Sequence, residues 1–120
     1  MKNKILVVDD DAELCEEMAE ILSDSGLSVV NTSDCKMVGQ LLKEHSFDAA
    51  ILDFKMPGKS GIDIMKEIKR ASPRTSIFLV SGKPFLENLT IKENVRDMLI
   101  DVISKPFDID ELIAKVKSII

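Results

Sequence analysis

Short aliphatic runs alternate with amphipathic stretches along the whole chain. Five runs are five or six residues long, at 4–8, 27–31, 49–53, 76–81 and 100–104. Most are nearly continuous in aliphatic residues, a pattern typical of parallel strands that are covered on both faces. The second run is more polar than the others, which favours a place at the edge of the sheet.

The intervals between these runs carry helical spacing of apolar residues. The first helix is expected to stop at Gly26, the third to end before Pro73, and the fourth to begin near Pro84. The residues expected to mark the other four helices are Leu14, Met18, Ile21 and Leu22; Val38, Leu41 and Leu42; Ile62, Met65, Ile68 and Lys69; and Ile109, Leu112, Ile113, Val116 and Ile120.

Strict alternation of five strands and five helices predicts an α/β protein with helices on both faces of a parallel sheet. Right-handed crossovers leave few topologies, and the flavodoxin-like, doubly wound (βα)5 order 2-1-3-4-5 is the common one at this size. A length of 120 residues predicts a single domain over 1–120, without an output domain in this chain.

Composition narrows the functional classes. The net charge of −5 and the absence of Trp and Tyr argue against direct binding of nucleic acid, which needs a basic face. Cys15 and Cys35 lack metal-ligand or CxxC spacing and are interpreted as small buried residues. No signal peptide or membrane span is expected, and the composition suits a cytoplasmic protein that meets other proteins or a cation.

Polar residues follow four of the aliphatic runs directly. They are Asp9 and Asp10, Asp53, Ser81, and Lys105. In an open α/β sheet, ligands bind beyond the carboxyl ends of the strands, so these side chains are expected to converge at one rim.

The types of these residues predict phosphoryl chemistry. Three neighbouring carboxylates repel one another, and a hard dication such as Mg²⁺, which takes oxygen ligands, relieves that repulsion. Asp9 and Asp10 are adjacent and suit the metal, whereas Asp53 faces Lys105 and suits the nucleophile that forms an acyl phosphate. Lys105 and the hydroxyl of Ser81 then meet the remaining phosphoryl oxygens.

The chain resembles the receiver domain of bacterial two-component response regulators. The matching segments are "VVDDD" at 7–11, "LDFKMPGKSG" at 52–61, "VSG" at 80–82 and "KPF" at 105–107. The resemblance implies that Asp53 is the phosphoacceptor and that Asp9, Asp10, Asp53 and the carbonyl of Lys55 hold Mg²⁺, or Mn²⁺ in its place. It also implies catalytic roles for Ser81 and Lys105, a cis bond at Lys105–Pro106, and phosphoryl transfer from a histidine kinase or phosphotransfer protein.

The sequence departs from the family pattern at the expected output face. Val102 stands where receivers usually have Phe or Tyr, and Met98-Leu99 replaces a frequent Gly-Ala. One interpretation is ordinary core; the other is a homodimer or partner surface made by helix four, strand five and helix five. A protein that sediments as a monomer before and after phosphorylation would exclude the dimer.

Other interpretations remain open for single residues and for the whole chain. Asp11 is expected to cap the first helix, and His45, the one histidine, to lie near a helix end without a chemical role. Lys55 and Lys83 are either solvated or control the lifetime of the acyl phosphate. The alternatives to a receiver, which is not a turnover enzyme, are a phosphorylation-independent interaction module, a phosphohydrolase and a flavodoxin.

Overall fold

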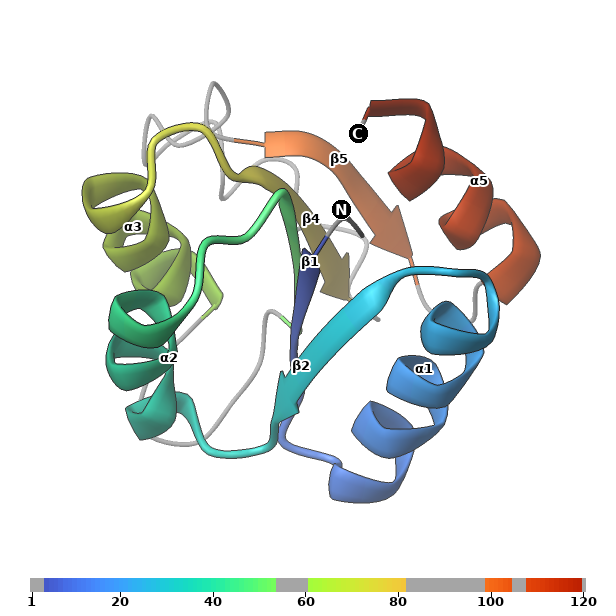
Figure 1. Cartoon of the computed structure of the whole chain (residues 1–120), viewed down its shortest axis with the longest axis horizontal. Coiled ribbons are helices and arrows are strands. Elements are labelled where there is room, and N and C mark those ends of the chain that lie inside the picture. Colours follow the sequence, from blue (N-terminus) through green and yellow to red (C-terminus); the bar gives the residue numbers. More distant parts are fainter. Residues whose placement is uncertain (1–3, 54–60, 82–98, 105–107, 120) are drawn as a thin grey trace.

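The computed structural model describes residues 4–53, 61–81, 99–104 and 108–119 of the chain (Figure 1). The expected fourth helix near Pro84 lies outside these residues. The described elements are β1 (Lys4–Val8), α1 (Ala12–Asp24), β2 (Ser28–Thr32), a 3-10 helix η1 (Cys35–Met37), α2 (Val38–Glu44), β3 (Ala49–Asp53), α3 (Gly61–Ala71), β4 (Ser76–Ser81), β5 (Leu99–Ser104) and α5 (Ile109–Ile119).

The five strands form one parallel sheet in the order β2-β1-β3-β4-β5, so the predicted topology is confirmed. The predicted strands at 4–8, 49–53 and 76–81 match the observed bounds, and the other two differ by one residue. Val8 pairs with Leu52, and Asp53 pairs with Val80. These registers bring the carboxyl ends of β1, β3 and β4 together, and we call this end of the sheet the rim.

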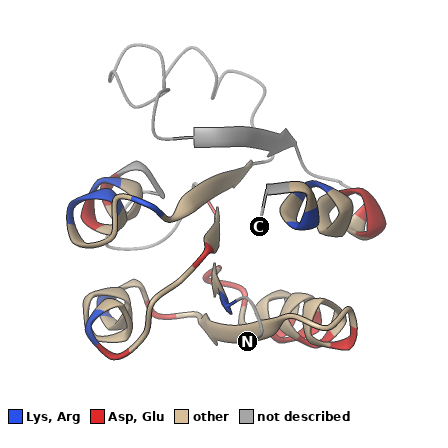
Figure 2. Ribbon diagram, turned by 45° about the horizontal axis from the view of Figure 1, so that its top comes forward, with Lys and Arg blue, Asp and Glu red and all other residues tan. Residues whose placement is uncertain are grey.

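Helices cover both faces of the sheet, with α2 and α3 on one side and α1 and α5 on the other (Figures 1 and 2). Successive residues of each strand point to opposite faces. In β1, Leu6 and Val8 therefore pack in the cluster that contains α2 and α3, while Ile5 and Val7 pack in the cluster that contains α1 and α5. This two-sided burial explains the uninterrupted aliphatic runs.

The predicted apolar face of α1 is confirmed at Met18 and Leu22, but it missed Cys15 and wrongly included Ile21. The helix buries Cys15, Met18 and Leu22, whereas Leu14 is only half-buried and Ile21 is 36% exposed. Each residue turns the helix by about 100°, so Leu14 and Ile21 both lie on one side of the stripe made by Cys15, Met18 and Leu22. In α3 the spacing likewise missed Ile64, which is fully buried.

Helix ends follow the predicted signals. Asp11 is the N-cap of α1, and its Oδ1 accepts the backbone N–H of Leu14 at 3.2 Å. Gly26 has φ of 94°, a left-handed conformation that suits glycine, and Leu27 N–H closes the turn on the Leu22 carbonyl. Further along, α3 ends at Ala71, before the proline that was expected to stop it.

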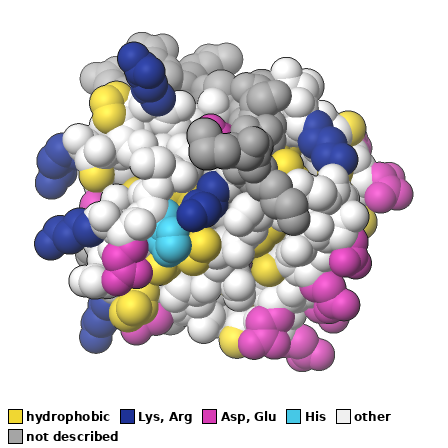
Figure 3. Space-filling model, viewed as in Figure 1, with side chains coloured by type: hydrophobic (Ala, Val, Ile, Leu, Met, Phe, Trp, Pro, Cys, Tyr) yellow, Lys and Arg dark blue, Asp and Glu magenta, His cyan; other side chains and the backbone are white. Residues whose placement is uncertain are grey.

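Charge is divided unevenly between the two helical layers. Acidic side chains gather over α1, and lysine and arginine gather on the side of α2 and α3 (Figure 3). Helix α1 has no basic residue, and its acidic residues are Glu13, Glu16, Glu17, Glu20 and Asp24. Within the described ranges, no helix has the length and apolar character needed to cross a membrane.

Candidate functional site

Two of the predicted site residues stand where buried strands end. Asp9 follows β1 directly and is 4% exposed, and Asp53 is the last residue of β3 and is 8% exposed. Both continue the alternation of their strands on the side of α1 and α5, because Val7 and Ile51 belong to that cluster. The β1–β3 register places the two aspartates side by side at the rim.

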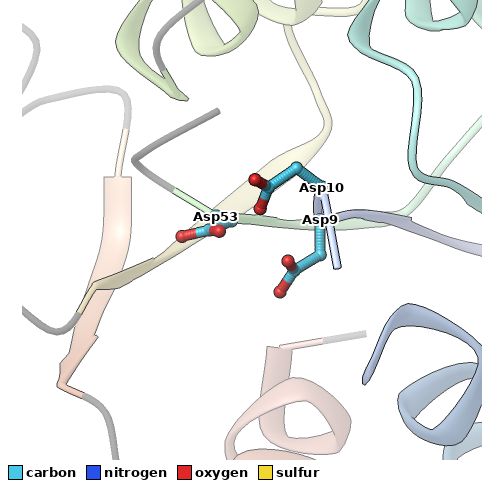
Figure 4. A group of neighbouring side chains, drawn as sticks. All are labelled: Asp9, Asp10 and Asp53. Carbon is cyan, nitrogen blue, oxygen red and sulfur yellow. The ribbon is translucent and has the colours of Figure 1, made fainter. Parts of the chain in front are cut away.

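The structure brings Asp9, Asp10 and Asp53 together (Figure 4). One carboxylate oxygen from each lies within 4.8 Å of the others, and Asp10 is exposed whereas the other two are not. Oxygens on opposite sides of an octahedral Mg²⁺ lie about 4.2 Å apart. Oxygens on adjacent positions lie about 3.0 Å apart, so the three side chains would draw together around the ion. The cluster therefore has the donor type that a small hard cation takes, gathered from two strand ends within 4.8 Å.

Hydrogen bonds orient the backbone and the carboxylate of Asp9. Its N–H donates to the carbonyl of Thr32, at the end of β2, over 3.3 Å. Its Oδ1 accepts the N–H of Asp11 at 3.0 Å, and Asp11 in turn caps α1. The turn from β1 into α1 thus ties the first acidic residue to both the helix and the edge strand.

Cys15 lies behind this turn and was missed as a site-related residue. The interpretation of both cysteines as small buried residues is confirmed, since Cys15 is 1% and Cys35 7% exposed. However, the Cys15 thiol also reaches the Thr32 carbonyl, at 3.5 Å. Burial raises the pKa of this thiol, and the nearby Asp9 carboxylate raises it further. No sequence signal other than its place one turn after the acidic run pointed to this contact.

The remaining predicted site residues are placed only in part. Ser81 is the last residue of β4, and its backbone pairs with Ser104 at the end of β5. Lys105 is the next residue after that strand, but it lies outside the described residues, as do Lys55, Lys83 and Pro106. Ser81 therefore stands at the same rim as the carboxylates.

His45 lies away from this rim, as expected. It is the C-cap of α2, and its Nδ1 is 3.0 Å from Nζ of Lys4, the first residue of β1. Its ring also packs on Phe47 at a centroid distance of 5.7 Å. Because Lys4 begins the strand that Asp9 follows, the histidine lies near the amino end of β1, opposite the end that carries the acidic cluster.

Comparison with known sequences identifies relatives over almost the whole chain. A family model described as "Response regulator receiver domain" matches residues 5–117. The transcriptional regulatory protein CpxR of Klebsiella pneumoniae is 36% identical over 118 residues, which cover 98% of this chain and 49% of that protein. CpxR of Escherichia coli K12 is 35% identical over the same length. The chain thus spans about half the length of these curated relatives.

Two solved structures with the same architecture are described as response regulators. A receiver domain protein from Clostridium thermocellum superposes with a TM-score of 0.85 at 27% identity, covering 97% of this chain and 92% of that one. The response regulator protein TrrA from Thermotoga maritima, solved in complex with Mg²⁺ and BeF, superposes with a TM-score of 0.83 at 28% identity over 100% of both chains.

Proposed function

Because this chain belongs to the response regulator receiver domain family, we propose that Asp53 is the residue that accepts the phosphoryl group in its signalling reaction. Receivers act in phosphorylation-dependent two-component signalling, where they meet histidine kinases or phosphotransfer proteins. The observation that carries the proposal is the convergence of Asp9, Asp10 and Asp53 within 4.8 Å at the ends of two neighbouring strands.

In the proposed reaction, a carboxylate oxygen of Asp53 attacks the phosphorus of a phosphohistidine. The new P–O bond forms as the P–N bond breaks, and the bonding electron pair stays on the histidine nitrogen, which takes up a proton. The product is an acyl phosphate on Asp53. Water later attacks the same phosphorus and returns the free carboxylate, so the domain is a reactant in a signalling exchange and not a turnover enzyme.

We assign Asp9, Asp10 and Asp53 to a magnesium site on the chemistry and spacing of their oxygens. Bound Mg²⁺ would supply positive charge that offsets the negative charge of the phosphoryl oxygens and of the three carboxylates. We propose Asp9 and Asp10 as metal ligands next to Asp53, the nucleophile. Hydrogen bonds hold Asp9 in place, and Asp10 is more exposed. The solved Mg²⁺–BeF complex of the related TrrA supports magnesium, whereas occupancy by Mn²⁺ is only an expectation.

The other roles are proposed from sequence position. Ser81, at the end of β4, would donate its hydroxyl to the phosphoryl group, and Lys105, which follows β5, would place its ammonium there. The carbonyl of Lys55 would be a further metal ligand. The homodimer surface around helix four and the cytoplasmic location stay predictions.

A small phosphodonor tests the proposal without knowledge of the kinase. After incubation with acetyl phosphate and Mg²⁺, the wild-type protein should be retarded on a gel containing a phosphate-binding ligand. Asp53→Asn should migrate as untreated protein, since an amide does not form the acyl phosphate. Equal migration of treated and untreated wild type would instead favour the phosphorylation-independent interaction module.

A further inference from the structure

The Cys15 side chain joins three elements around the backbone of Asp9. Its Sγ lies 3.5 Å from the Thr32 carbonyl and 3.8 Å from the Val7 carbonyl, and Asn31 Nδ2 donates to it at 3.7 Å. These are distances expected for the weak hydrogen bonds of sulfur. Since Cys15 is on α1, Val7 on β1 and Asn31 on β2, one buried atom connects the helix to both strands.

The Thr32 carbonyl connects this thiol to the acidic cluster. It accepts the N–H of Asp9 at 3.3 Å while it is also the nearer acceptor for the thiol of Cys15. The Thr32 carbonyl is thus shared between the backbone N–H of Asp9 and the thiol of Cys15.

The affinity of a site for Mg²⁺ depends on the groups that hold its ligands in position. Mg²⁺ demands near-ideal octahedral geometry, so a carboxylate that shifts by a few tenths of an ångström binds it less well. Groups that orient the ligands of a metal site typically affect its affinity about 10- to 100-fold.

We infer that Cys15 is a positioning residue of the candidate metal site. Through the Thr32 carbonyl it steadies the backbone of Asp9, and with it the carboxylate, and Asn31 in turn holds the thiol. The inference rests on the proposed function, because it assumes that Asp9 helps to bind Mg²⁺. Serine keeps a donor but has a shorter side chain, so it replaces the thiol only in part. Alanine removes the donor and leaves a small void beside the turn.

Magnesium titration of matched variants tests the inference. Calorimetry should show Mg²⁺ binding to the wild type, an affinity about tenfold weaker in Cys15→Ala, and an intermediate value in Cys15→Ser. The matched control is Cys35→Ala, which truncates a buried cysteine in the other core cluster. Its affinity should stay within about twofold of the wild type, because separate sites act independently. Urea unfolding of each variant establishes that it is folded during the titration.

An exposed variant tests the same link if Cys15→Ala does not fold. Asn31 is exposed, so Asn31→Ala leaves the core intact while it removes the donor to the thiol. It should weaken Mg²⁺ binding about two- to threefold, the loss expected for one weak hydrogen bond. Wild-type affinity in Asn31→Ala and Cys15→Ser, or equal losses in Cys15→Ala and Cys35→Ala, would overturn the positioning role. Absence of Mg²⁺ binding by the wild type would overturn the proposed function itself.

Discussion

At the scale of single residues, Asp9 and Asp10 are neighbours in the sequence but differ in burial, because the chain leaves the sheet here. Asp9 continues the alternation of β1 and is nearly buried, whereas Asp10 is exposed where the chain turns toward α1. A buried carboxylate needs hydrogen bonds or a cation to offset its lost hydration. The backbone N–H of Asp11 supplies one such bond to Asp9. A buried acidic residue and an exposed one can therefore share a cation site and still differ in how firmly each is held.

The raised pKa of Cys15 leads to a prediction about stability at alkaline pH. The thiol of the unfolded chain ionises near its ordinary value of 9.0, whereas burial keeps it protonated in the folded state. The unfolded state therefore loses protons first, and the free energy of unfolding falls as the pH rises above 9.0. For one group the slope is at most about 1.4 kcal/mol per pH unit.

Urea unfolding at pH 8 and pH 10, in a reducing buffer, measures this effect. The difference in free energy of unfolding between the two pH values should be larger for the wild type than for Cys15→Ala. The comparison cancels other titrating groups because both proteins contain them. An equal pH dependence in the two proteins would contradict a protonated thiol in the folded state.

At the scale of elements, a polar network joins the end of α3 to the start of β4. The ammonium of Lys69 donates to the carbonyls of Pro73 and Thr75 at 3.2 and 2.6 Å, and burial lowers its pKa. The hydroxyl of Thr75 donates to the Phe47 carbonyl at 2.8 Å and pairs with the Ser72 hydroxyl at 2.7 Å. The network fixes where β4 enters the sheet beside β3, and so helps to set the register that ends at the rim.

Removal of the buried hydroxyl should destabilise the protein. Thr75 is fully buried, so Thr75→Val keeps the shape of the side chain but takes a donor from the Phe47 carbonyl. The free energy of unfolding should fall by about 1–3 kcal/mol, the cost of an unsatisfied buried polar group.

A solvent-exposed hydroxyl that also donates to a backbone carbonyl provides the control for this experiment. Ser118 donates to the Lys115 carbonyl at 2.7 Å but is exposed, so Ser118→Ala should change stability by less than about 0.5 kcal/mol. Chemical denaturation of both variants supplies the comparison. A Thr75→Val protein as stable as the wild type would exclude a stabilising role for the network.

At the scale of the whole molecule, the sequence predicted the sheet and its rim better than it predicted contacts between elements. The aliphatic runs before Asp9 and Asp53 are read directly along the chain, and the 2-1-3-4-5 order follows from few allowed crossovers. The buried face of α1 is harder to predict, because Leu14 and Cys15 are adjacent in the sequence and either could belong to the apolar stripe. The contact of Cys15 with Thr32 depends on that phase and on the packing of α1 against β2, which no local pattern specifies.

The central claim is that carboxylates from separate strand ends hold Mg²⁺ so that Asp53 accepts a phosphoryl group. Borohydride reduces an acyl phosphate to an alcohol, so it marks the modified aspartate as homoserine. After treatment of the wild type with acetyl phosphate, peptide mass spectrometry should locate homoserine at position 53 when Mg²⁺ is present and not when it is chelated. Homoserine at another aspartate, or equal modification of Asp53 without the metal, would contradict the account.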